Sequence, residues 1–181
     1  IVIDIGTADG RLPLMIADRA KRIVAIDISE IMIKKATENL GRTKVGNVRF
    51  EVADARHLPF PDKSFDVAIS RRGPATSDTD FLGEVYRILK SGGDFVEITI
   101  GERDKENIKK IFGRGQNYEC LIENRKEVVR KKKMLEDVGF GKMELKEIEC
   151  VEYYETMEDL IFLLQNTPII PDFDIKKDRD Y

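Results

Sequence analysis

Two aspartates and two glycines lie close together at the start of the chain: Asp4, Gly6, Asp9 and Gly10. An apolar run precedes them, so the pattern predicts a buried strand that ends in a turn where the backbone can approach a ligand. Two like charges about 4 Å apart cost roughly 4 kcal/mol at an effective dielectric near 20, so these carboxylates disfavour a pyrophosphate. They favour a cation. The turn therefore suits a nucleoside that carries an ammonium and a sulfonium group better than it suits a dinucleotide, and a plain strand-to-helix turn without a ligand is the alternative.

A second acid follows at a spacing typical of nucleotide-binding folds. Asp27 lies 17 positions after Gly10 and ends a second apolar run, where a carboxylate can accept hydrogen bonds from ribose hydroxyls. Ile28 comes next and offers an apolar surface on which an adenine ring can stack. A solvated acid at a strand end is the alternative for Asp27. A third run, Val48 to Val52, is followed by Asp54, so three strands are expected to end near polar residues at one edge of the sheet.

The stretch Asp4-Ile-Gly-Thr-Ala-Asp-Gly10 resembles the D-x-G-x-G-x-G motif of class I S-adenosylmethionine-dependent methyltransferases. The longer stretches 53–67 and 85–93 resemble the same family more specifically. Ala8 departs from the motif because it stands where the family usually has its middle glycine. Either the turn avoids a positive φ at this residue, or the alanine costs about 1 to 2 kcal/mol and weakens binding.

The resemblance implies S-adenosyl-L-methionine as the cofactor and a set of residues that bind it. In this family the acid at the position of Asp54 accepts from the adenine amino group, and the next backbone N–H meets the ring. The cofactor-binding residues expected on this basis are Asp4, Gly6, Thr7, Ala8, Gly10, Asp27, Ile28, Asp54, Ala55 and Ser70. The loop from Ser70 to Thr76 is expected to face the methyl group. Its Arg71 and Arg72 are candidates for binding the substrate, with recognition of the methionine carboxylate and plain solvation as the alternatives.

The resemblance further implies transfer of a methyl group to a small-molecule acceptor by in-line displacement. No catalytic residue is assigned, because a sulfonium is already activated and proximity alone can supply roughly 7 to 11 kcal/mol in favourable cases. His57, the only histidine, is expected to be a loop residue rather than a base. The alternatives are a non-catalytic S-adenosylmethionine-binding module, a subunit of an RNA-modifying methyltransferase, and a nicotinamide-dependent reductase, which the charges of Asp4 and Asp9 disfavour.

The hydrophobic patterns predict an α/β fold: a Rossmann-like, doubly wound, mainly parallel sheet with helices on both faces, in three α/β/α layers. Strands are expected over residues 1–5, 22–26, 48–52, 65–70, 94–100 and 143–154. Helices are expected over 10–20, after Ser29 to Leu40, through Phe81 to Leu89, and over 106–112, 126–138 and 156–164. Ser29 is expected to cap the second helix, and a capping box is expected at Thr156.

The chain has 181 residues and a formal net charge of −3, which is ordinary for one domain and disfavours a dedicated nucleic-acid binder. We expect a single methyltransferase domain over 1–181, with a cofactor-binding core at 1–101 and a variable part at 102–181, and without the N-terminal helices and C-terminal strand usual in the family. No run is long enough to span a membrane, and no cysteine or histidine spacing indicates a metal site. A cytoplasmic location is expected, and the oligomeric state is left open.

Overall fold

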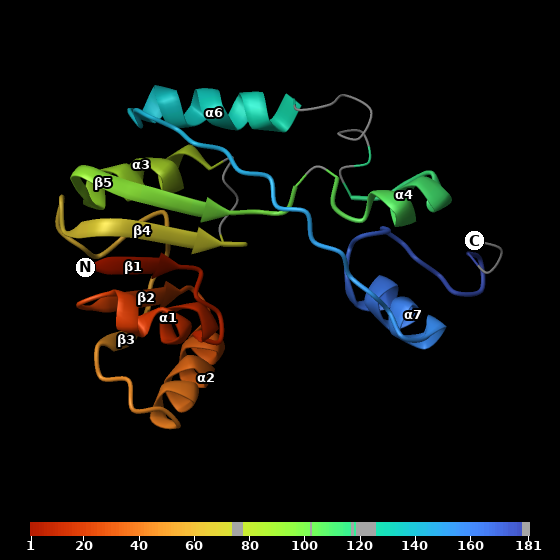
Figure 1. The fold of residues 1–181 in the computed structure, drawn as a ribbon, viewed down its shortest axis with the longest axis horizontal. Coiled ribbons are helices and arrows are strands. Elements are labelled where there is room, and N and C mark those ends of the chain that lie inside the picture. Colours follow the sequence, from red (N-terminus) through yellow and green to blue (C-terminus); the bar gives the residue numbers. More distant parts are fainter. Residues whose placement is uncertain (74–77, 102, 117, 119–125, 179–181) are drawn as a thin grey trace. The chain divides into compact units, whose positions relative to one another are not determined.

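The computed structural model describes residues 1–73, 78–101, 103–116, 118 and 126–178. These residues fall into two compact units (Figure 1). The first unit contains Ile1–Thr99 and Lys131–Lys142, and the second contains Ile100–Arg130 and Met143–Tyr181. The expected division at residue 101 stays a prediction, and the segment 131–142 is a later part of the chain that belongs to the first unit.

The first unit is built on a parallel sheet of five strands in the order β3-β2-β1-β4-β5. The strands are β1 (Val2–Ile5), β2 (Ile23–Asp27), β3 (Val48–Val52), β4 (Phe65–Arg71) and β5 (Leu89–Ile98). The chain order reverses direction between β1 and β4. In open α/β sheets, ligands bind at the carboxyl ends of the strands at such a switch point. The predicted fold class is confirmed.

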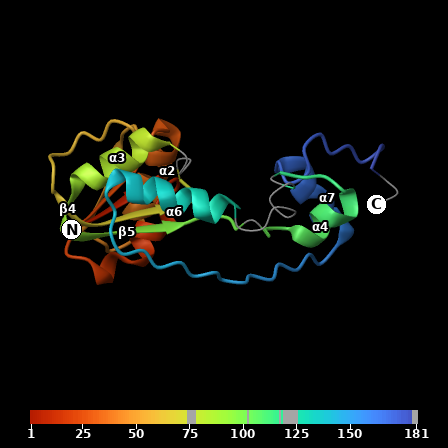
Figure 2. The same ribbon diagram turned by 90° about the horizontal axis from the view of Figure 1, so that it is seen from above.

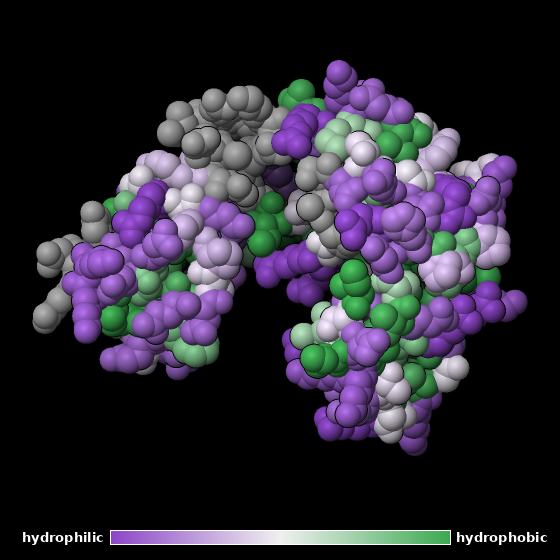
Figure 3. Space-filling model, turned by 180° about the vertical axis from the view of Figure 1, so that it is seen from behind, coloured by the Kyte–Doolittle hydropathy of each residue, from purple (hydrophilic) through white to green (hydrophobic). Residues whose placement is uncertain are grey.

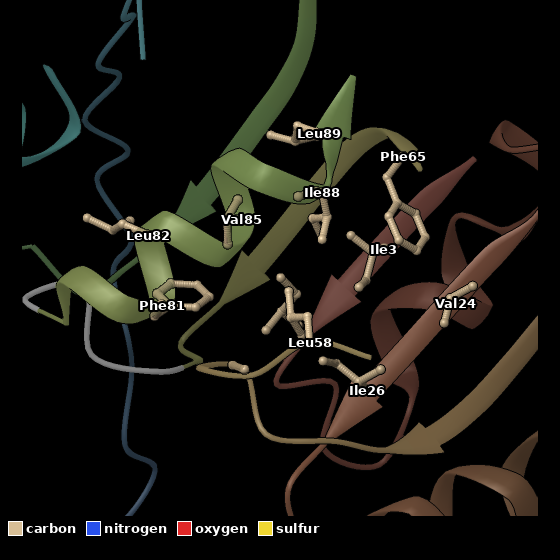
Figure 4. Close-up of a cluster of buried hydrophobic side chains, with 13 residues drawn as sticks. Ile3, Val24, Ile26, Leu58, Phe65, Phe81, Leu82, Val85, Ile88 and Leu89 are labelled. Carbon is tan, nitrogen blue, oxygen red and sulfur yellow. The ribbon is translucent and has the colours of Figure 1, made fainter. Parts of the chain in front are cut away.

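Alternation of apolar residues along the central strands supplies two packed faces. Ile3, Ile5, Val24 and Ile26 pack on one side against helix α3 (Thr79–Ile88), whose Phe81, Val85 and Ile88 are fully buried (Figure 4). On the other side Val2, Ile23 and Val48 pack with Ala17, Ile16 and Leu40, which come from the segment Arg11–Arg19 and from helix α2 (Glu30–Gly41). Helices therefore cover both faces, as a doubly wound sheet requires. Helix α3 lies along β4 and β5 in both ribbon views (Figures 1 and 2).

Local signals fix the ends of these helices. The Ser29 side chain caps α2 by accepting from Met32 N at 3.3 Å, and Asp78 caps α3 by accepting from Asp80 N and Phe81 N. Both caps are polar side chains of the kind that helix N-termini prefer.

The predicted loop from Ser70 to Thr76 is described only up to residue 73, because residues 74–77 lie outside the described residues.

Two sequence predictions in this unit are wrong in their bounds. The first helix is shorter than 10–20: α1 covers Arg11–Met15, and a separate 3-10 turn η1 covers Ala17–Arg19. The fifth strand begins at Leu89, not at Asp94. The pairing of β4 with β5 shifts register between Phe65 and Val67, and Gly92 has φ +78, so the strand continues past Gly92 and Gly93 through a bulge.

The second unit contains α4 (Glu106–Phe112), α7 (Met157–Asn166) and the N-terminal part of α6 (Lys126–Val138), all three predicted. Leu164, Ile169 and Ile170 form its small core, and Thr156 closes the predicted capping box with Asp159. The strand predicted over 143–154 is absent. This segment pairs with no strand among the described residues, and its apolar side chains, such as Leu145 and Tyr153, are exposed. Alternating sequence alone cannot supply the hydrogen-bonding neighbour that a strand needs.

The C-terminal part of α6, from Lys131 onward, is part of the first unit. Leu135 and Val138 contact the core that Figure 4 shows, and Lys131 forms an ion pair of 2.6 Å with Glu97. Hydrophilic side chains cover much of the surface in Figure 3, with apolar side chains between them. Among the described helices, none is long and apolar enough to cross a membrane.

Candidate functional site at the carboxyl edge of the sheet

The carboxyl end of β1 carries a buried acid whose surroundings leave one oxygen unpaired. Asp4 is 1% exposed, and neither its Oδ2 nor the Thr7 hydroxyl has a hydrogen-bond partner in the described part of the chain. Burial raises the pKa of Asp4 to about 6, and the nearby Thr7 hydroxyl and Arg71 charge oppose part of that rise. Buried polar atoms without partners are rare, and they mark a place for a ligand or water.

These two residues line a cavity of about 160 Å³, together with Gly6, Ala8, Asp9, Arg11, Leu12 and Arg71. The lining brings two carboxylates and two guanidinium groups to one small space. A group that is itself zwitterionic, such as the amino and carboxyl groups of an amino acid, finds a partner for each charge there. The volume is below the range of about 300–1,000 Å³ usual for drug-sized ligands, so it suits one segment of a ligand rather than the whole.

The glycine turn is tied to the end of β2. Gly6 N and Thr7 N both donate to Ile26 O at 2.9 Å, and Ala8 N donates to Asp27 Oδ2 at 2.9 Å. Ala8 has φ +50, so the turn does not avoid a positive φ at the position where the family usually has a glycine. The Asp27 carboxylate and the Ile26 carbonyl hold the turn in this conformation, which costs an alanine about 1 to 2 kcal/mol.

Gly10 is required for packing as well as for backbone geometry. Its φ is +77, and a Cβ there would come within 2.6 Å of Phe50 Cζ and 2.9 Å of Ala36 Cβ. The start of α1 therefore lies directly against β3 and α2. This close approach sets the position of the turn relative to the neighbouring strand end.

Asp27 retains capacity for a ligand after binding the turn. Its Oδ1 accepts from Ser29 N at 3.0 Å and its Oδ2 accepts from Ala8 N. A carboxylate has about four acceptor positions, so two remain. Ile28 follows with 65% of its surface exposed, as an apolar contact for a flat ring would require. Ala53 N donates to Asp27 O at 3.1 Å, which joins the ends of β2 and β3.

Asp54 lies beyond β3 and is held by Arg56. Its Oδ1 accepts from Arg56 N at 2.9 Å and from Arg56 Nε at 3.2 Å, and its Oδ2 accepts from Arg56 Nη2 at 2.9 Å. These hydrogen bonds lower the pKa of Asp54 to about 2, so it is an ionised acceptor at neutral pH. Ala55 is buried in the core beside it, whereas the His57 side chain is exposed.

Nine of the predicted residues fall into two groups along one edge, and Gly10, Ser70 and Arg72 belong to neither. Asp4, Gly6, Thr7, Ala8 and Arg71 line the cavity, while Asp27, Ile28, Asp54 and Ala55 lie at the ends of the adjacent strands β2 and β3. Ser70 is buried at the end of β4, and Gly73 is packed so closely that a Cβ would meet Ser70 Oγ at 2.4 Å. Arg72 does not line the cavity; it has φ +53, and its N–H donates to Ile98 O.

Sequence reasoning missed part of the cavity lining. Asp9, Arg11 and Leu12 line the cavity, yet only the charge of Asp9 entered the prediction. Arg11 and Leu12 begin the helix after Gly10, and this position was the available signal. Among the described residues, no cluster of His, Cys, Asp and Glu could hold a metal ion.

Comparison with known proteins identifies the class that this fold and edge define. Residues 2–93, about half of the chain, match the family described as "Methyltransferase domain". The chain belongs to this methyltransferase family, as the glycine turn and the 53–67 stretch predicted.

Individual relatives carry the same description. The chain is 32% identical to a ubiquinone/menaquinone biosynthesis C-methyltransferase, UbiE, of Azotobacter vinelandii. The alignment extends over 117 residues, which are 61% of this chain and 46% of the relative. It is 34% identical to a malonyl-[acyl-carrier protein] O-methyltransferase of Geobacter sulfurreducens, over 61% of this chain and 42% of the relative. The crystal structure of the YcgJ protein of Bacillus subtilis matches with a TM-score of 0.51 and 34% identity, over 53% of this chain and 42% of that one. The chain therefore spans less than half the length of these relatives.

Proposed function

We propose that this protein is an S-adenosyl-L-methionine-dependent methyltransferase that acts on a small-molecule acceptor. The observation that carries the proposal is the cavity at the end of β1, where the unpaired Asp4 Oδ2 and Thr7 Oγ1 lie with Arg71 in a chain of the methyltransferase family. A pyrophosphate would face Asp4 and Asp9 there. An amino acid would instead place its ammonium against the carboxylates and its carboxylate against an arginine.

The donors and acceptors along this edge suit each part of the cofactor in turn. Asp4, Thr7 and the backbone of the glycine turn would hold the amino acid end, and the two remaining acceptor positions of Asp27 would hold the ribose hydroxyls. Ile28 would lie against the adenine ring. Asp54, kept ionised by Arg56, would accept from the adenine amino group, next to Ala55.

S-adenosylmethionine supplies a sulfonium-activated methyl group, so the chain's own task is to bind and orient. We assign no side chain as an indispensable base; His57 is exposed and lies in the loop of Asp54 rather than in the cavity. Arg71 lines the cavity from the end of β4, where it can bind the methionine carboxylate or an anionic group of the acceptor. Holding a nucleophile in line with the methyl group can account for most of the rate in favourable cases.

A small acceptor fits the charge of the chain and the names of its relatives. The formal net charge of −3 disfavours a polyanionic substrate. In the basic run 130–133, Lys131 pairs with Glu97 and Lys132 approaches Glu136 at 3.9 Å, so two of its charges have acidic partners within the protein. A cytoplasmic location is part of the proposal, with the acceptor itself left unnamed.

Methyl transfer tests the proposal directly. The protein is incubated with S-adenosylmethionine that carries a tritiated methyl group and with a panel of quinol, acyl-carrier and small phenol or amine acceptors. Radioactive product identifies an enzyme. Saturable cofactor binding without transfer to any acceptor of this panel would favour an alternative. Transfer to RNA would then indicate an RNA-modifying subunit, and no transfer to RNA either would indicate a binding module.

Arg71→Ala then separates the two roles open to that residue. If Arg71 binds the acceptor, KM for the acceptor rises tenfold or more while cofactor affinity stays constant. If it binds the methionine carboxylate, affinity for S-adenosylhomocysteine falls. His57→Ala serves as the control and should leave turnover nearly unchanged; loss of turnover with intact cofactor binding would replace the proximity account with general-base catalysis.

A further inference from the structure

One ion pair on helix α3, between Glu84 and Arg87, binds four polar groups of the segment 58–62. Arg87 Nη2 donates to Leu58 O at 3.0 Å, and Arg87 Nη1 donates to Phe60 O and to Asp62 Oδ1, both at 2.8 Å. Glu84 Oε2 accepts from Leu58 N at 2.6 Å. A single guanidinium and a single carboxylate thus hold Leu58 at both its N–H and its carbonyl.

The two side chains also fix each other. Arg87 Nε donates to Glu84 Oε1 at 2.7 Å and Nη2 donates to Glu84 Oε2 at 2.8 Å, a bidentate pairing that only the planar fork of arginine provides. Both are largely shielded, with 31% of the Arg87 side chain and 21% of the Glu84 side chain exposed. The hydrogen bonds from Arg87 lower the pKa of Glu84, so the pair is ionised at neutral pH.

Leu58 is fixed through its side chain as well. It is 5% exposed and packs in the cluster that Figure 4 shows, with Phe81 and Val85 of α3 and Ile26 of β2. Only three residues separate Leu58 from Asp54, and His57 N donates back to Asp54 O at 3.0 Å. The stretch from Asp54 to Leu58 is thus short and carries a hydrogen bond of its own.

On the basis of the function proposed above, we propose that Arg87, through Glu84, is a positioning residue for the adenine end of the cofactor site. Among the described residues, its hydrogen bonds go to Glu84, Leu58, Phe60 and Asp62, so it acts on Asp54 through the segment and not by a direct hydrogen bond. Its effect is to hold the segment that carries the Asp54 carboxylate and the Ala55 N–H in one backbone conformation. Loss of this support should act on recognition of the adenine amino group rather than on the amino acid end of the cofactor.

Calorimetric affinities of two ligands test this. S-adenosylhomocysteine presents the adenine amino group, and S-inosylhomocysteine presents an oxo group at the same position. Each is titrated into the wild type, Arg87→Met and Arg87→Lys, at a temperature at which circular dichroism shows every variant to be folded. We expect Arg87→Met to weaken binding of S-adenosylhomocysteine about tenfold and binding of S-inosylhomocysteine much less. The ratio between the two affinities should therefore become smaller. Arg87→Lys keeps the positive charge but loses the bidentate guanidinium geometry, so its affinity ratio should lie between those of the wild type and Arg87→Met.

Arg103→Met is the matched control, because Arg103 also pairs with a glutamate three residues away, Glu106, at 2.6 Å. It should leave both affinities unchanged. If Arg87→Met does not fold, Glu84→Gln removes the charged acceptor of Leu58 N and should narrow discrimination in the same way. A folded Arg87 or Glu84 variant that keeps both wild-type affinities overturns the positioning role and leaves Arg87 a purely structural residue. A wild type that binds neither ligand overturns the proposed function instead.

Discussion

Replacing Ala8 with glycine should stabilise the protein. Ala8 has φ +50, a conformation that costs an alanine about 1 to 2 kcal/mol and a glycine almost nothing. Its side chain is exposed, so little buried surface is lost. Glycine increases the entropy of the unfolded chain, which costs about 0.4 to 1 kcal/mol. The net gain in the free energy of unfolding, taken from the midpoints of these two ranges, is therefore about 0.8 kcal/mol.

Thermal and urea denaturation measure this gain. At about 2 to 4 °C per kcal/mol for a chain of this size, the midpoint should rise by roughly 1 to 4 °C. Ala20→Gly is the matched control, because Ala20 has φ −133 and ψ 143, where an alanine is unstrained. That substitution should destabilise by about 0.5 to 1 kcal/mol. Affinity for S-adenosylhomocysteine should not fall in Ala8→Gly, since the hydrogen bond from residue 8 N to Asp27 is kept.

The result that would refute this reasoning is a loss of stability in Ala8→Gly equal to that in Ala20→Gly. The turn would then hold residue 8 at no cost to an alanine, and the departure from the family's glycine would have no energetic meaning.

Three other substitutions test the site. Gly10→Ala should destabilise by about 2 to 4 kcal/mol in urea titrations, because the new Cβ meets Phe50 Cζ at 2.6 Å at φ +77, whereas Gly41→Ala, with open space around it, should be close to neutral. The pKa of Asp4 is raised from 3.8 to about 6, so the folded state binds its proton more tightly and wild-type stability falls as the pH rises through 6, by about 1 to 2 kcal/mol between pH 5 and pH 8. In Asp4→Asn that part of the pH dependence should vanish, and identical pH profiles of the two proteins would contradict it. Asp54→Ala should weaken S-adenosylhomocysteine and reduce discrimination against S-inosylhomocysteine, and an equal loss for both ligands would count against contact with the adenine amino group.

The sequence was sufficient to predict which strand ends meet. Asp4, Asp27 and Asp54 each follow an apolar run, and parallel strands of a doubly wound sheet present their carboxyl ends at one edge, so their neighbourhood follows from pattern and chain order. The same reasoning predicted the caps Ser29 and Thr156, because capping depends on residues three apart in the chain.

The sequence was insufficient where structure depends on contacts between distant residues. The segment 143–154 alternates like a strand, but pairing depends on a neighbour that its own residues do not specify. The bulge that carries β5 through Gly92 depends on the register with β4. Ala8 N donates to Asp27, 19 positions away, and Arg87 donates to Leu58 O, 29 positions away. No local sequence pattern indicates either hydrogen bond.

Calorimetric titration of the protein with S-adenosylhomocysteine, and separately with NADH, tests the central claim most directly. We predict saturable binding of S-adenosylhomocysteine at one site and no detectable binding of NADH. Asp27→Ala should weaken the former about ten- to a hundredfold, since hydrogen bonds to a charged acceptor are worth about 1.5 to 3 kcal/mol. Asp18→Ala, an exposed aspartate outside the site, should leave it unchanged. Binding of NADH in preference to S-adenosylhomocysteine, or an unchanged affinity in a folded Asp27→Ala variant, would contradict the assignment of this edge as the cofactor site.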